Sequence, residues 1–277
     1  MSCNSSKNRY GDIPCYDGTR VKLNSGDTDA TNYINASFVN GYRHKQAYIC
    51  CQGPLERTCN DFWQMVWQEN VRVIVMTTRY IFKSLTKEKG RVKCSNYWPE
   101  SEHEAHQYKG YFVVNTKIRT SEKYNISSLI LRCDQTEKIR LVYHVLFLAW
   151  PDYGVPACPD DLLQLIYRTR QLQEKGVKLA EKEDNWAGHP HGPPLIIHCS
   201  AGVGRSGTFM CVDICMRMLD EIQKTNIEEI VKALRTQRAF AVQTAKQFIF
   251  CHLAVLQYAI NTGILPADTK LPDILSD

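Results

Sequence analysis

The stretch that decides the fold is Leu195-Ile196-Ile197-His198-Cys199-Ser200-Ala201-Gly202-Val203-Gly204-Arg205-Ser206-Gly207-Thr208-Phe209. Its short apolar run indicates a buried strand, Cys199 opens a glycine-containing loop, and an apolar pattern with helical spacing follows Arg205. A loop that leads into a helix N-terminus points several free backbone N–H groups at one place, where the helix dipole adds positive character. The sequence therefore predicts an anion-binding cradle over residues 200–205.

The cradle holds a potential nucleophile. Gly202 and Gly204 allow the backbone to curl around an anion, and the planar fork of Arg205 suits two phosphate oxygens. Thiols at such positions have pKa values of roughly 3.5–7.5, so Cys199 is predicted to be a thiolate. The competing interpretation is a buried cysteine before an ordinary turn. A nucleotide-binding P-loop is disfavoured because Arg205, and not a lysine, follows the glycines.

The stretch resembles the HCxxGxGRS signature of the protein tyrosine phosphatases. The resemblance implies that Cys199 attacks phosphorus, that Arg205 binds the phosphate, that Ser206 hydrogen-bonds the leaving thiolate and that His198 orients the loop. It also implies that backbone amides of the loop bind the phosphate oxygens, with contacts from Ser200, Ala201, Gly202, Val203 and Gly204.

Two further segments resemble elements that shape the family's substrate pocket. In residues 7–14, Tyr10 occupies the position of a Tyr that stacks on the substrate ring, Asp12 that of an acid that holds the peptide backbone, and Ile13 adjoins them. In Trp150-Pro151-Asp152-Tyr153-Gly154, the resemblance makes Asp152 the general acid, on a loop that closes over substrate next to Tyr153. A turn-stabilising role is the alternative for Asp152.

Two more segments resemble the family's E-loop and Q-loop. In the first, Glu88 would pair with Arg205 and Lys93 would face substrate, although a solvated charge in a hairpin is the alternative for Glu88. In the second, Gln243 would position the water that hydrolyses the cysteinyl-phosphate, and Gln247 would support it. An amide suits this role because it can donate and accept hydrogen bonds without titrating.

The resemblance implies an α/β fold with a twisted mixed β-sheet flanked by helices on both faces. We expect one catalytic domain over residues 1–277, with family elements at about 7–262 and without the helices that usually lead the family. From the residue pattern we expect a helix capped by Thr58, a buried strand over 71–76 and an antiparallel meander over 108–150. We also expect helices over 159–176, 227–237 and 245–260, with an exposed loop over 174–194.

Composition narrows the class of protein. The chain has 277 residues, 44% hydrophobic and 23% charged, which is ordinary for a globular protein. Its net charge of +5 suits an anionic substrate. The chain has no long basic run of the kind that would indicate nucleic-acid binding. No apolar run predicts a transmembrane segment. Twelve cysteines without disulfide-like spacing indicate a reducing, cytoplasmic location. His189 and His191 lack companion ligand spacing, so no metal site is predicted.

Within the family, segments 77–79 and 236–240 resemble most a cytosolic subgroup whose longer members carry a CRAL-TRIO domain. The resemblance implies metal-independent hydrolysis of phosphotyrosyl proteins or peptides by a monomer without a cofactor. A pseudophosphatase that binds phosphotyrosine without hydrolysis is one alternative, and a dual-specificity or phosphoinositide phosphatase is another.

Overall fold

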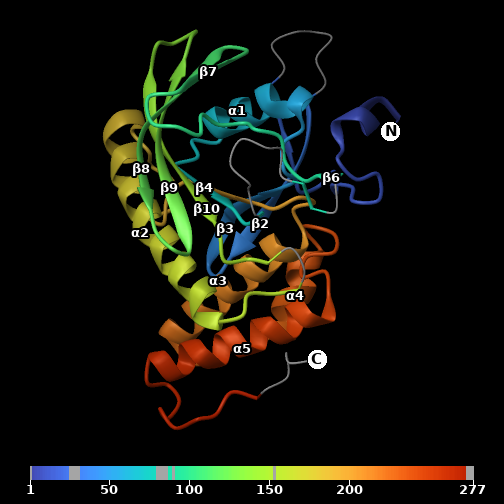
Figure 1. Cartoon of the computed structure of the whole chain (residues 1–277), viewed down its shortest axis with the longest axis vertical. Helices are drawn as coiled ribbons and strands as arrows, with labels where there is room; N and C mark the ends of the chain where they lie inside the picture. The colour runs from blue at the N-terminus through green and yellow to red at the C-terminus, as the bar shows by residue number, and fades with distance from the viewer. Residues whose placement is uncertain (1, 25–31, 79–86, 89–90, 152–153, 273–277) are drawn as a thin grey trace.

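The computed structural model describes residues 2–24, 32–78, 87–88, 91–151 and 154–272. A nine-stranded sheet forms the centre, in the order β1-β2-β3-β11-β4-β10-β9-β8-β7 (Figure 1). In chain order these strands are β1 (Arg20–Lys22), β2 (Tyr33–Gly41), β3 (His44–Cys51), β4 (Val73–Met76), β7 (Ala105–Tyr108), β8 (Tyr111–Thr120), β9 (Tyr124–Cys133), β10 (Ile139–Phe147) and β11 (Leu195–His198).

The sheet is mixed, as predicted. Strands β3, β11, β4 and β10 run parallel in its middle, whereas β1–β2–β3 and β10–β9–β8–β7 pair antiparallel on either side. The expected meander is confirmed, with β7 added at its edge. Because β11 lies between β3 and β4, Cys199 follows the carboxyl end of a central strand, where open α/β sheets place their ligands.

Helices cover both faces of the sheet. The helix α1 (Cys59–Gln68) packs on one face, and α2 (Pro159–Asp184), α3 (Gly204–Ile222), α4 (Ile227–Arg235) and α5 (Ala245–Asn261) lie on the other (Figure 1). Successive residues of β11 point to opposite faces of the sheet. Ile196 belongs to the hydrophobic core on the α1 face, and Ile197 belongs to the core on the face covered by α2 to α5. No helix of the described ranges is long and apolar enough to cross a membrane.

The helix α2 corrects the prediction that residues 174–194 form a loop. It continues to Asp184, because Leu172, Gly176 and Ala180 repeat every four residues as a buried stripe. Two of the three are small, which weakens the apolar signal in the sequence. Gly176 is required for packing, since a Cβ there would lie 2.6 Å from the Cβ of Arg72.

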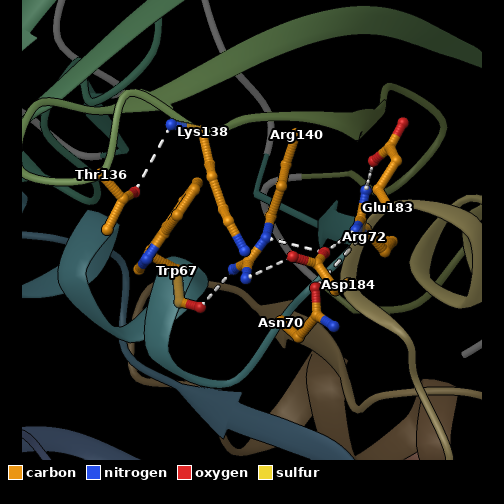
Figure 2. Close-up of polar contacts among 8 residues, drawn as sticks. All are labelled: Trp67, Asn70, Arg72, Thr136, Lys138, Arg140, Glu183 and Asp184. Atoms are coloured by element: carbon orange, nitrogen blue, oxygen red, sulfur yellow. Dashed lines mark hydrogen bonds and ion pairs between the residues drawn. The ribbon is translucent and has the colours of Figure 1, made fainter.

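An arginine cluster closes the carboxyl end of α2 (Figure 2). Arg72, whose side chain is fully buried, pairs with Glu183 at 2.8 Å and with Asp184. Arg140 binds the same Asp184 carboxylate with Nε and Nη2, each at 3.0 Å, and lies over the ring of Trp67 at 3.8 Å. Cations at a helix C-terminus also complement the helix dipole.

The cap predicted for α1 is half right. Thr58 is the N-cap residue, but its hydroxyl makes no cap hydrogen bond to the helix. It accepts instead from the amide of Leu55 at 2.9 Å, because the short 3₁₀ turn η2 (Glu56–Thr58) leads directly into α1. The other short elements are a 3₁₀ turn η1 (Ser2–Lys7) and a two-stranded pair, β5 (Lys87–Glu88) with β6 (Arg91–Val92).

Candidate active site

A cavity of about 560 Å³ opens at the carboxyl end of β11. It brings together most of the residues that the sequence predicts for a site. Its lining comprises Tyr10, Asp12, Ile13, Lys93, Gly154, Cys199, Ser200, Ala201, Gly204, Arg205, Gln243, Thr244, Lys246 and Gln247. Gly154, Thr244 and Lys246 were not among the predicted site residues. Gly154 ends the quoted segment 150–154, and the other two lie between Gln243 and Gln247.

Cys199 lies at the bottom of this cavity, with 5% of its surface exposed. The amide of Gly202 donates to its sulfur at 3.2 Å. Burial raises the pKa of the thiol, but hydrogen bonds from the hydroxyl and amide of Ser206, the charge of Arg205 and the amide of Val203 outweigh burial and hold the pKa below its usual value. The cradle therefore favours a thiolate.

The neighbouring thiol shows the opposite effect. Cys50, on β3, donates to the carbonyl of Gly202 at 3.1 Å. Burial raises its pKa to about 12. The two cysteines lie close to the same loop, but their surroundings shift their thiol pKa values in opposite directions. Of the two, only Cys199 has the lowered pKa that favours a nucleophilic thiolate.

Arg205 lies in the first turn of α3 and reaches across the cradle. Its Nη1 donates to the carbonyl of Thr77 at 3.3 Å, and its Nη2 to that of Pro151 at 3.2 Å. These contacts join α3 to the ends of β4 and of the segment after β10. The guanidinium is therefore held in the lining of the cavity.

The walls of the cavity come from opposite ends of the chain. Tyr10 forms one side, and its hydroxyl lies 2.8 Å from the Ser200 hydroxyl, while Asp12 is exposed at the edge. On the other side Gln243 is exposed, and the Gln247 side chain accepts from the amides of Gln243 and Thr244 at 3.0 and 3.2 Å. Gln247 therefore holds the backbone at Gln243, while the catalytic roles of the two glutamines stay predictions.

Comparison with known proteins decides the family. The sequence profile described as protein-tyrosine phosphatase matches residues 4–257. The chain belongs to the protein-tyrosine phosphatase family. Tyrosine-protein phosphatase non-receptor type 9 of Rattus norvegicus is 43% identical over 270 residues, 97% of this chain and 44% of that protein. Non-receptor type 2 of the same species is 36% identical over 260 residues, 94% of this chain and 57% of that protein.

A third relative extends the comparison to receptor proteins. Receptor-type tyrosine-protein phosphatase zeta of Rattus norvegicus is 36% identical over 282 residues, 98% of this chain and 11% of that protein. The chain spans less than half the length of the type 9 relative. The family is one of hydrolases, and the expected α/β fold of a protein-tyrosine phosphatase is confirmed.

Four predicted residues of this phosphatase chain lie behind the cavity rather than in its lining. Gly202 and Val203 turn the loop into α3, and Val203 is fully buried. Ser206 is buried too, and its hydroxyl donates to the Cys199 sulfur. His198 is fully buried, with Nδ1 placed 3.2 Å from the Cys199 carbonyl.

The loop requires glycine at position 202. Its φ of +68° favours glycine, and a Cβ there would lie 2.0 Å from the carbonyl oxygen of Cys51. The close approach brings the loop against the end of β3, where the amide of Gly53 donates to the Ser200 carbonyl at 2.9 Å. The cradle is therefore fastened to the sheet by backbone contacts.

One arginine binds the cradle loop directly and a second binds the segment beside it, and no sequence pattern indicates either role. Arg238 is fully buried and donates to the carbonyls of Gly202 and Ala201 at 3.0 and 2.9 Å. Arg9 donates to the carbonyls of Gly53 and Pro54 at 3.0 and 2.7 Å. An arginine that binds carbonyls from distant segments has no local sequence pattern, although Arg9 lies inside the quoted segment 7–14.

Three predicted residues remain without a described side chain. Asp152 and Tyr153 lie outside the described residues. Glu88 lies in β5, where its backbone pairs with Arg91, but its side chain is not described, so its pairing with Arg205 stays a prediction.

His189 and His191 lie beside His44, with ring centroids 3.8 and 6.0 Å from it, and neither belongs to the cavity lining.

Proposed function

We propose that this chain hydrolyses phosphotyrosine on proteins or peptides through a phosphocysteine intermediate. The observation that carries the proposal is a buried thiol with a lowered pKa, placed inside a cradle of backbone amides beside Arg205. The names of the relatives support the same substrate class. A cavity with an aromatic wall at Tyr10 favours a long aryl phosphate over a short alkyl one.

In the first step, the Cys199 thiolate attacks phosphorus, the S–P bond forms and the P–O bond to the tyrosine breaks. The loop amides and Arg205 bind the three equatorial oxygens, where negative charge is spread in the transition state. Asp152 gives its proton to the leaving oxygen, so a neutral phenol departs. Positioning and electrostatics supply most of the rate.

In the second step, water held by Gln243 attacks the phosphocysteine. Asp152 now accepts a proton from the water, the S–P bond breaks and inorganic phosphate leaves. The Ser206 hydroxyl, which lies beside the sulfur, donates to the departing thiolate.

The test is hydrolysis of an aryl phosphate and a phosphotyrosyl peptide by the wild type and by Cys199→Ser, without added metal. We expect turnover by the wild type and a loss of about 10⁴-fold or more in the variant, because a hydroxyl is a far weaker nucleophile than a thiolate. A phosphoserine peptide and a phosphoinositide serve as substrate controls.

Each contrary outcome has a definite meaning. Peptide binding without turnover by the wild type would favour a pseudophosphatase. Preferred hydrolysis of the phosphoinositide would favour a lipid phosphatase. If Cys199→Ser turned over substrate as fast as the wild type, Cys199 would not be the nucleophile.

We also infer an intracellular, reducing location. Eleven of the described residues are free cysteines, and a thiolate enzyme needs a reducing compartment. A secreted form that keeps its activity without added thiol would contradict this inference.

A further inference from the structure

A continuous line of hydrogen bonds runs from the middle of the sheet to the catalytic cysteine. His198 Nδ1 lies 3.2 Å from the Cys199 carbonyl oxygen, and His198 Nε2 lies 2.6 Å from the Tyr97 hydroxyl. The same hydroxyl lies 2.7 Å from Nε2 of His144, on β10. All three side chains in the line are almost completely buried, so water does not compete for these bonds.

Each ring in this line is neutral near pH 7. Burial lowers the pKa of His198 to about 4 and the pKa of His144 well below its usual value. A neutral imidazole carries one N–H and one bare nitrogen. The distribution of protons along the line is therefore fixed by its partners.

The direction of every bond follows from the carbonyl. The Cys199 carbonyl can only accept, so His198 must carry its proton on Nδ1 and leave Nε2 bare. The Tyr97 hydroxyl must then donate to His198 Nε2. Its oxygen is left to accept, and the donor available at 2.7 Å is Nε2–H of His144. The two histidines are thus required to be opposite tautomers.

We propose that His144 is a positioning residue for the reaction: its Nε2–H orients the Tyr97 hydroxyl, which fixes His198 as the Nδ1–H tautomer that holds the Cys199 carbonyl. The inference rests on the proposed function only for its catalytic consequence. The assignment of the tautomers stands on the contacts alone.

The surroundings hold His144 in place for this role. Its backbone pairs with Ile74 of β4 on one side and with Ser127 of β9 on the other. The Trp98 ring stacks on its imidazole, with centroids 4.4 Å apart and planes 19° apart. A ring fixed on a central strand offers a donor that cannot turn away from Tyr97.

The line of bonds acts on the backbone that carries the nucleophile. The His198 carbonyl is held by the Thr77 amide at 2.9 Å, and the next carbonyl, that of Cys199, is held by the His198 ring. Together these bonds set the direction in which the chain leaves β11. The Cys199 sulfur must be placed accurately to receive the Gly202 amide and the other cradle donors.

The first measurement is the ¹⁵N signature of the imidazoles at pH 7. We expect His198 as Nδ1–H and His144 as Nε2–H, assigned by comparison with single histidine variants. His198 as Nε2–H, or His144 as Nδ1–H, would overturn the proposal even if the protein is an active phosphatase. The same spectra can be read if the protein proves inactive, so failure of the proposed function is distinguishable.

The second measurement is the pH profile of Cys199 alkylation by iodoacetamide in three variants. His144→Leu removes the donor, and His144→Gln keeps an amide N–H near the same place. Tyr97→Phe removes the hydroxyl that joins the two rings. We expect His144→Leu and Tyr97→Phe to raise the thiol pKa and to lower kcat about two- to tenfold, the range of one buried hydrogen bond, with KM little changed. The His144→Gln variant should recover most of the loss.

The matched control is Tyr108→Phe. The Tyr108 hydroxyl donates to the backbone carbonyl of Tyr97 at 2.6 Å, in the same aromatic cluster but outside the line of bonds. Its removal should lower stability to a similar degree without moving the alkylation profile. If Tyr108→Phe and Tyr97→Phe shift the profile equally, or if His144→Leu shifts nothing, the positioning role is wrong.

Discussion

Arginine side chains cluster at both ends of the parallel strands, but their roles at the two ends differ. At the carboxyl ends, Arg205 ends the cradle and Arg238 binds its carbonyls. Arg9 binds the carbonyl of Gly53, whose amide donates to the Ser200 carbonyl. At the amino ends, Arg72 precedes β4 and Arg140 lies near the start of β10, where both meet the carboxyl end of α2 (Figure 2). The same type of side chain thus supports the candidate active site at one end and a structural joint at the other.

The partners of the arginines explain the difference. Arg72 and Arg140 share the carboxylate of Asp184, and Arg72 also pairs with Glu183, so two positive and two negative groups balance in the joint. Arg238 donates to two carbonyls of the cradle loop, which fixes the loop without adding a negative group. Arg238 thus fixes the cradle loop through carbonyl partners, whereas Arg72 and Arg140 join three elements through carboxylate partners.

Arg205→Lys tests the cradle end and should have the largest effect. Lysine keeps the charge but loses the planar fork that meets two phosphate oxygens. We expect kcat for an aryl phosphate to fall about 10²–10³-fold, the cost of removing one transition-state donor, with little change in thermal stability. Steady-state kinetics and a melting curve check both parts. A loss of stability comparable to the loss of activity would make Arg205 a structural arginine like Arg72.

Arg72→Met tests the joint. The substitution leaves Glu183 without its ion pair and removes a guanidinium whose side chain is fully buried. We expect the free energy of unfolding to fall by about 2 kcal/mol, measured by urea denaturation, because the fully buried guanidinium loses its hydrogen bonds to charged groups, while Arg140 still binds Asp184. The kcat of the remaining folded protein should stay near the wild-type value. A change in the pH profile of Cys199 alkylation would show that the two ends are coupled.

The cradle and its supports also differ in how far they could be predicted from the sequence. The cradle could be predicted because its residues are close in the chain: Cys199, Gly202 and Arg205 follow one another at fixed offsets in a strand–loop–helix unit. The walls were predicted through Tyr10 and Gln243, which lie in separate motifs that the resemblance linked. Local spacing and family resemblance therefore identified most of the residues that line the candidate site.

The supports could not be predicted, because they depend on tertiary contacts. Arg238 reaches loop carbonyls 36 and 37 residues away, and Tyr97 meets its histidines at separations of 47 and 101 residues. The full length of α2 was missed for a similar reason. Gly176 reads as a helix breaker in the sequence, but it permits the close packing of the helix against Arg72.

Arg140→Lys makes the comparison with Arg205→Lys direct, since the same substitution is placed in the other region. Lysine keeps a charge near Asp184 but loses the two-point contact with that carboxylate and the stacking over Trp67. We expect a loss of about 1 kcal/mol in the free energy of unfolding and no change in kcat, because Arg72 still binds Asp184. Urea denaturation and aryl phosphate kinetics on one preparation measure both. If Arg140→Lys lowers kcat as much as Arg205→Lys is expected to, the joint is not a purely structural element. The proposed difference in role between the two ends of the sheet would then be wrong.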